Sequence, residues 1–157
     1  IAHPALLYVM VLAGEEIPDL LQQLASEHPA TDPFLAEVNR YHRQEETRHL
    51  SFARAVLPAM WQQASRPEQA VVHRVAPLAI TAMFDTLVHP GVYETVGLDG
   101  WTTWKQVRST PERVALRHRA TRKVLAALLD AGVVRAGAVP GGWQRLCGVD
   151  AGGRPAG

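Results

Sequence analysis

Cysteine and aromatic residues are scarce in this sequence of 157 residues, and this scarcity excludes some kinds of site and favours one fold class. The single cysteine, Cys147, excludes an internal disulfide and any metal site built from cysteines alone, which suits a reducing compartment. The chain has only three Phe and three Tyr, is rich in Ala, Leu and Arg, and has no stretch with convincing strand alternation. We therefore expect an all-α protein of the cytoplasm.

An excess of one charge and a long apolar run are also absent. The chain carries 16 Lys and Arg against 15 Asp and Glu, and its arginines are spread along the sequence, which does not fit a dedicated nucleic-acid binder. The longest apolar stretch, residues 5–13, is far shorter than the roughly 20 residues that a membrane-spanning helix needs. We expect neither a nucleic acid nor a membrane as a partner.

Apolar residues that recur every three or four positions predict a series of amphipathic helices. The first covers residues 4–24, and Pro18 is expected to bend it shortly after a pair of glutamates. The second covers about 33–57, with the capping residue Asp32 before it and Pro58 as its end.

In the later part of the chain the apolar pattern predicts two more helices joined by an irregular connection. A third helix covers 67–87 with a bend at Pro77, and a fourth covers 111–131. In the connection between them we expect Trp101 and Trp104 to be buried as anchors.

One domain is expected over residues 1–150, because a chain of this size can bury one substantial core.

Thr110 is the predicted N-terminal cap of the helix over 111–131, and Gly132 is the residue at which this helix is predicted to end. Residues 151–157 are rich in Gly and Pro, and we expect them to form a disordered tail.

The second predicted helix places His42, Glu46 and His49 on one stripe. At about 100° per residue, Glu46 lies roughly 40° from His42 and His49 roughly 20° to the other side. The same stripe carries four apolar residues, so we expect it to face the interior. These four are Leu35, Val38, Ala53 and Val56. A buried carboxylate between two imidazoles is costly without partners, and a metal ion satisfies all three side chains.

The spacing of Glu46 and His49, Glu-x-x-His, is the one that di-iron four-helix bundles place on inward-facing helices, with single glutamates from neighbouring helices. The preceding helix offers Glu15 and Glu16 for that purpose. Carboxylates combined with imidazoles suit iron. The zinc-protease motif His-Glu-x-x-His is absent, since His42 and His49 are too far apart for it.

An interpretation without metal is also open at this stage. His42 and His49 would then be ordinary half-buried histidines, and Glu45, Glu46 and Arg48 a solvated cluster of ion pairs.

Other polar residues receive smaller roles. Asp19 is a candidate hydrogen-bond partner for a ligating histidine, and Glu45 and Arg48 are either such partners or a surface ion pair. Cys147 is expected to be an inert thiol. The remaining histidines lack a paired carboxylate and are expected to be surface or core residues. They are His73, His89 and His118.

Two segments together resemble a known family. Gly14-Glu-Glu-Ile17 followed by Tyr41-His-Arg-Gln-Glu-Glu-Thr-Arg-His-Leu-Ser-Phe-Ala53 resembles the AurF-like di-iron N-oxygenases, the p-aminobenzoate N-oxygenase family. The likeness is specific over the first 60 residues. Beyond them it rests on general helical character and on a late tryptophan, Trp143.

The resemblance implies a ferritin-like helical bundle holding two iron ions (Fe²⁺/Fe³⁺), with O2 as co-substrate. By this resemblance the metal ligands are Glu15, His42, Glu46 and His49. Glu15 is preferred over Glu16 because its distance ahead of His42 is closer to the spacing in the family. The implied reaction is oxidation of the nitrogen of a small arylamine, with an electron donor that the sequence does not name and with homodimerisation left open.

Members of the family carry a further glutamate and a further Glu-x-x-His on two preceding helices, which are absent from residues 1–157. We therefore expect this chain to be the C-terminal portion of a longer oxygenase and its bundle to be incomplete, or else the missing ligands to come from another chain. On its own it is expected to bind metal weakly and to be inactive.

Three alternatives stay open on sequence alone. The same centre could hydroxylate carbon or use a manganese and iron pair. The chain could be an iron-binding helical bundle without oxygenase activity. It could also be a helical interaction domain that binds no metal.

Overall fold

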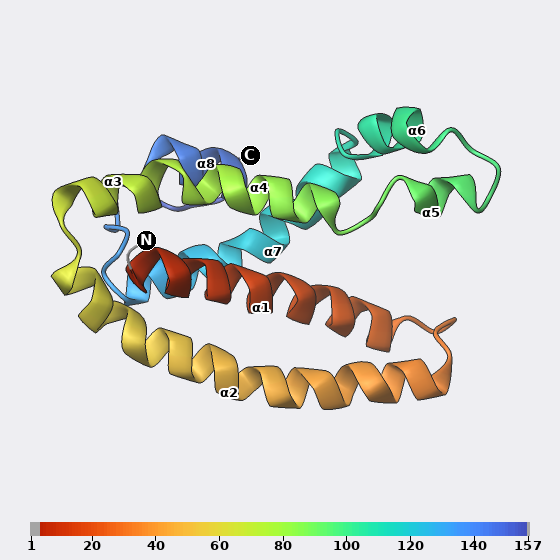
Figure 1. The fold of residues 1–157 in the computed structure, drawn as a ribbon, viewed down its shortest axis with the longest axis horizontal. Helices are drawn as coiled ribbons and strands as arrows, with labels where there is room; N and C mark the ends of the chain where they lie inside the picture. The colour runs from red at the N-terminus through yellow and green to blue at the C-terminus, as the bar shows by residue number, and fades with distance from the viewer. Residues whose placement is uncertain (1–3, 157) are drawn as a thin grey trace.

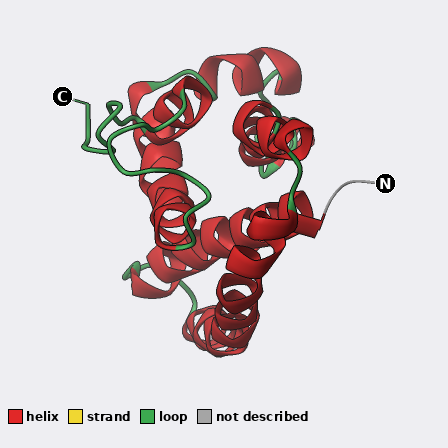
Figure 2. Cartoon of the chain, turned by 90° about the vertical axis from the view of Figure 1, so that its left-hand side faces the viewer, coloured by secondary structure: helices red, strands yellow, loops and turns green. Residues whose placement is uncertain are grey.

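The computed structural model describes residues 4–156 and is all-α, as expected. Its helices are α1 (Pro4–Glu27), α2 (Pro33–Gln63), α3 (Arg66–Arg74), α4 (Ala76–Thr86), α5 (Gly91–Glu94), α6 (Gly100–Val107), α7 (Pro111–Asp130) and α8 (Gly141–Cys147). Figure 1 shows α1 in the middle of the bundle, with α2 along one side of it and α3, α4 and α8 on the other. Figure 2 shows helices joined by loops, and the described residues contain no strand.

The central helix α1 is largely buried, because its apolar side chains recur at helical spacing and pack against several neighbouring helices. Its fully buried apolar residues are Ala5, Val9, Leu12, Ala13 and Ile17. It packs mainly against α2 and also contacts α7, α4 and α3. The helix runs through Pro18 and ends at Glu27, three residues beyond the predicted end.

Helix α2 begins as predicted but ends later. The side chain of Asp32 accepts hydrogen bonds from the backbone N–H groups of Phe34 and Leu35 at 2.9 and 3.3 Å. The predicted end at Pro58 is wrong, since α2 continues to Gln63. A proline inside a helix removes one backbone hydrogen bond, and here the fully buried Leu57 and the partly buried Trp61 anchor the surrounding turns in the core.

The third predicted helix is divided into α3 and α4 near the proline that was expected to bend it. Pro77 has no N–H to donate to the carbonyl of His73, so the regular ladder is interrupted there. Helix α8 packs against this interruption through Gly142. A Cβ at Gly142 would lie 3.2 Å from Cγ of Pro77 and 3.4 Å from the carbonyl oxygen of His73, so glycine permits the close approach.

The connection between α4 and α7 contains the short helices α5 and α6, and its two tryptophans differ in burial. Trp104 is partly buried and donates its indole N–H to the carbonyl of Asp85 at 3.0 Å. The prediction that Trp101 is buried is wrong, because its side chain is 60% exposed. Trp101 lies edge-on against Trp104, with ring centroids 5.9 Å apart, on the side away from the core.

Both ends of α7 agree with the sequence. Thr110 accepts a 3.3 Å hydrogen bond from the backbone N–H of Arg113, and Gly132 has the left-handed φ of 71° that a helix stop requires. After α8 the backbone forms a hydrogen-bonded loop, in which Asp150 N–H donates to the carbonyl of Arg154 at 2.8 Å. The segment expected to be a disordered tail thus takes part in this loop through residue 156.

One stretch of the described residues, Arg66–Glu94, is long and apolar enough by composition to cross a membrane. It was not singled out from the sequence. Core helices of soluble proteins can have the same length and composition. Only 28% of the apolar window of this stretch is buried, although Ile80 and Phe84 are fully buried in the core. The stretch is therefore weak evidence for a membrane.

Candidate metal centre

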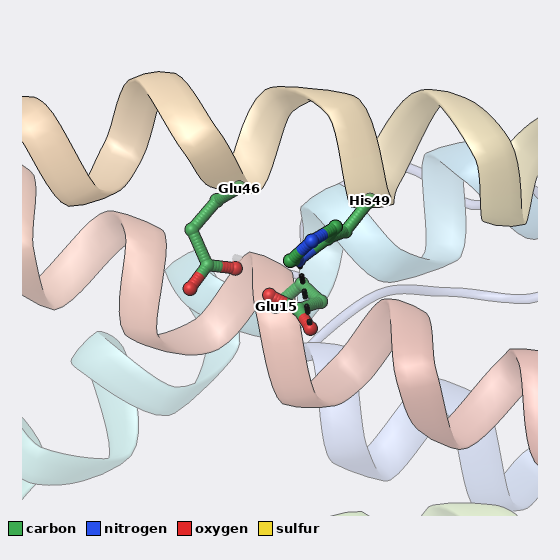
Figure 3. A group of neighbouring side chains, drawn as sticks. All are labelled: Glu15, Glu46 and His49. Carbon is green, nitrogen blue, oxygen red and sulfur yellow. Dashed lines mark ion pairs between the residues drawn. The ribbon is translucent and has the colours of Figure 1, made fainter.

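Three of the predicted ligands come together where α1 and α2 lie side by side. Glu15 extends from α1, and Glu46 and His49 extend from α2 toward it (Figure 3). One ligand atom from each of the three side chains lies within 4.8 Å of the other two. The Nδ1 atom of His49 is 3.8 Å from Oε1 of Glu15. The Glu-x-x-His pair and the glutamate of the neighbouring helix therefore share one site.

Glu46 is the most buried member of this group. The residue is 8% exposed, and its Oε2 atom is buried without a hydrogen-bond partner in the part of the chain that the structure describes. Buried carboxylate oxygens are nearly always paired in folded proteins. A metal ion, or a donor from outside the described residues, would satisfy this oxygen.

His42 lies next to the group and contacts it through Glu46. Its Nδ1 atom is 3.1 Å from Oε1 of Glu46 and also lies within hydrogen-bond distance of the side-chain amide of Gln22. The structure therefore brings all four predicted ligands to one region, with His42 just outside the closest group of three.

The stripe on which these ligands lie is less buried than expected. Ala53 is fully buried, but Leu35 and Val38 are 55% and 46% exposed, so the prediction of an interior stripe is wrong for the first half of α2. The side chains of His42 and His49 are 55% and 65% exposed. Among the described helices α2 packs chiefly against α1, so the part of this stripe that α1 does not cover, with the side chains of His42 and His49, is open.

The two neighbouring glutamates of α1 have different surroundings. Glu15 faces α2 at the candidate site, whereas Glu16 is 2% exposed and forms an ion pair with Arg54. Successive residues of a helix point about 100° apart, so only one of the pair can face the site.

Asp19 has a role that the sequence did not suggest. The expectation that it binds a ligating histidine is wrong, because its carboxylate accepts hydrogen bonds from Nε of Arg43 at 2.7 Å and Nζ of Lys123 at 3.0 Å. Burial alone would raise the pKa of Asp19, but these hydrogen bonds and the two positive charges outweigh it and lower the pKa. Lys123 is distant in sequence and lies on α7, so no local pattern could have indicated this bridge.

The remaining polar residues near the site have surface roles. Glu45 and Arg48 form an ion pair at 3.1 Å, with Arg48 78% exposed. Away from the site, Cys147 is buried, and burial raises the pKa of its thiol to about 11. A thiol with so high a pKa is a poor nucleophile, as expected for this residue.

The donor set fits iron. Ligand atoms about 2.1 Å from one metal ion are at most about 4.2 Å apart, so a separation within 4.8 Å needs only small side-chain rotations to close on an ion. Two carboxylates and an imidazole are suitable ligands for iron. One glutamate and one Glu-x-x-His pair are half of the set that di-iron helical bundles use.

One comparison with known proteins found a match. Residues 1–132 match the family model described as P-aminobenzoate N-oxygenase AurF. The match extends well beyond the first 60 residues, in which the characteristic motifs lie. No curated protein and no solved structure matches the chain.

Proposed function

Since this chain belongs to the p-aminobenzoate N-oxygenase AurF family, a family of di-iron proteins with a ferritin-like helical fold, we propose that it forms part of a non-haem di-iron oxygenase. The enzyme would oxidise the nitrogen of an arylamine with O2 in the cytoplasm. The observation that carries the proposal is the meeting of Glu15, Glu46 and His49, with a buried oxygen of Glu46 left unpaired among the described residues.

The glutamates and the histidines of the proposed centre would contribute in different ways. Glu15 and Glu46 would supply negative charge that offsets the charge of the metal ions, and His49 and His42 would supply nitrogen donors. Glu46 lies between His42 on one side and the Glu15 and His49 pair on the other, so it would hold metal together with either set of donors. Bound iron would supply the activation of O2 for transfer of an oxygen atom to the amine nitrogen.

We further propose that the rest of the centre comes from two more helices, in the same polypeptide or in a partner. The described chain offers one Glu-x-x-His pair where di-iron bundles use two. The open face of α2 carries the exposed side chains of His42 and His49 together with Leu35 and Val38. Helices packed on this face would bury the apolar residues and bring further ligands to the same point.

The test of the oxygenase proposal uses the complete polypeptide that contains this sequence. It is loaded with Fe²⁺ without oxygen, supplied with a reductant, and then exposed to O2 with p-aminobenzoate as the first substrate. We expect an N-oxidised product, loss of nearly all turnover in His49→Ala, and unchanged turnover in His89→Ala as the matched control. Iron binding with no oxidised product from any arylamine would support a bundle that holds iron without oxygenase activity.

The proposal of an incomplete centre has its own test. The 157-residue chain alone is expected to bind Fe²⁺ weakly and to give no product, whereas the complete polypeptide binds two iron ions. Turnover by the 157-residue chain alone would show that no further ligands are required.

A further inference from the structure

A groove with an unusual charge lies beside α3, α4 and α8. Figure 1 shows these helices on the other side of α1 from α2. Three neighbouring pockets of about 370, 480 and 230 Å³ form it. The first and second share His73 and Pro140, and the second and third share Leu78, Gly142 and Arg145. We call this continuous surface the basic groove.

The charged residues that line the basic groove are all basic. Arg135 lines the first pocket, Arg74 the second, Arg145 the second and third, and Arg117 the third, with no Asp or Glu among the lining residues. The whole chain is nearly balanced, with 16 basic and 15 acidic residues. The basic residues are therefore concentrated in the groove, and its positive charge does not follow from the overall composition of the chain.

Most of these arginines lack an acidic partner. Arg117 lies 3.9 Å from a carboxylate oxygen of Asp85. Arg74, Arg135 and Arg145 form no ion pair within the described residues, so their guanidinium groups are available to a ligand. A guanidinium group binds phosphate or carboxylate in a bidentate manner.

The first pocket is lined by an aromatic and a polar side chain in addition to its arginine. The ring of Trp61 lines it and meets His73 edge-on, with ring centroids 5.3 Å apart. The Nδ1 atom of His73 is buried without a hydrogen-bond partner among the described residues. Trp61 therefore provides both a flat surface for part of a ligand and a fluorescent probe inside the groove.

We propose that the basic groove binds a small molecule that carries two or more anionic groups, either phosphate or carboxylate. The arginines of the second and third pockets hold the anionic groups, and the Trp61 wall holds the less polar part. This site is separate from the proposed di-iron centre.

The test measures binding of two probes, pyrophosphate and citrate, to the complete polypeptide at constant ionic strength, by calorimetry and by the change in tryptophan fluorescence. We expect saturable binding of at least one probe, and the tighter of the two identifies phosphate or carboxylate as the preferred group. In the double variant Arg74→Gln/Arg145→Gln the affinity is expected to fall about tenfold or more, because two charged contacts are lost. Trp61→Phe should remove the fluorescence change and keep the calorimetric signal.

The matched control is Arg40→Gln/Arg48→Gln, which removes two exposed arginines from α2, and circular dichroism checks the fold of each variant. Its affinity is expected to stay within twofold of the parent. Absence of saturable binding of both probes, or an equal loss in the control, would overturn the proposal. If the double variant does not fold, the single variants Arg74→Gln and Arg145→Gln decide in the same way.

Discussion

Asp19 on α1 accepts a 2.7 Å hydrogen bond from Nε of Arg43 on α2, one residue after the predicted ligand His42. The same carboxylate also accepts a hydrogen bond from Lys123 on α7 at 3.0 Å. Asp19 is one turn along α1 from Glu15. This bridge therefore joins three helices and holds α1 and α2 in the register in which Glu15 faces Glu46 and His49.

Replacing Asp19 by Asn should make the protein less stable in a manner that depends on pH. The folded-state pKa of Asp19 lies below its ordinary value of 3.8. Its stabilising contribution is therefore complete above the unfolded pKa and is lost as the pH falls through the folded pKa. We expect Asp19→Asn to lower the free energy of unfolding by about 1–2 kcal/mol at pH 7, with a smaller difference at pH 3.

Urea unfolding at both pH values checks this prediction, with the exposed Glu37→Gln as the control. An equal loss of stability at pH 3 and pH 7 would show that the charge of Asp19 is not responsible.

Replacing Arg54 by Met should be strongly destabilising, because it leaves the carboxylate of Glu16 buried and unpaired. Leaving a buried carboxylate without its partner costs about 1–3 kcal/mol, and the pair is only partly buried because the side chain of Arg54 is 51% exposed. The exposed pair of Glu45 and Arg48 provides the control, since Arg48→Met should cost less than about 1 kcal/mol. The double variant Glu16→Gln/Arg54→Met should recover part of the loss, and similar stabilities for Arg54→Met and Arg48→Met would contradict the prediction.

The two adjacent glutamates of α1 should give opposite results when each is changed to Gln. Glu15→Gln removes a proposed ligand that is partly exposed, so we expect Co²⁺ or Fe²⁺ affinity to fall and stability to change by less than about 0.5 kcal/mol. Glu16→Gln removes the partner of Arg54, so we expect lower stability with metal affinity nearly unchanged. The reverse pattern would assign the ligand to Glu16.

Cys147 should react slowly with iodoacetamide in the folded protein at pH 8. Its thiol is buried, and its pKa of about 11 leaves very little thiolate at that pH. We expect rapid alkylation, followed by mass spectrometry, only after denaturation in urea. Equal rates in the folded and unfolded protein would show that Cys147 is accessible.

Periodicity and capping residues were enough to predict the long helices. Asp32, Thr110 and Gly132 mark their ends through local hydrogen bonds or backbone geometry, which a single sequence specifies. Pro58 misled the prediction, because whether a helix continues past a proline depends on the packing of the next turn. That packing comes from other helices and leaves no local signal.

At the candidate site, too, local sequence patterns predicted the ligands but not the contacts between distant segments. The spacing of Glu46 and His49, with the neighbouring glutamates of α1, was sufficient to place the ligands at one position. The exposure of Leu35 and Val38 could not be predicted, because periodicity gives the direction of a side chain and not what packs against it. The bridge from Asp19 to Lys123 is likewise a contact between distant segments.

The central claim, that the face of α2 next to α1 binds metal, is tested most directly by Co²⁺ titration of two variants of the complete polypeptide. Glu46→Ala removes the buried carboxylate of the site, and Glu45→Ala removes the adjacent, partly exposed one, so the pair is matched in chemistry and position. The account predicts that Glu46→Ala weakens Co²⁺ binding by about tenfold or more, with loss of the visible absorption bands of the bound ion, and that Glu45→Ala binds like the parent. Co²⁺ binding by Glu46→Ala with the affinity and spectrum of the parent would contradict the account.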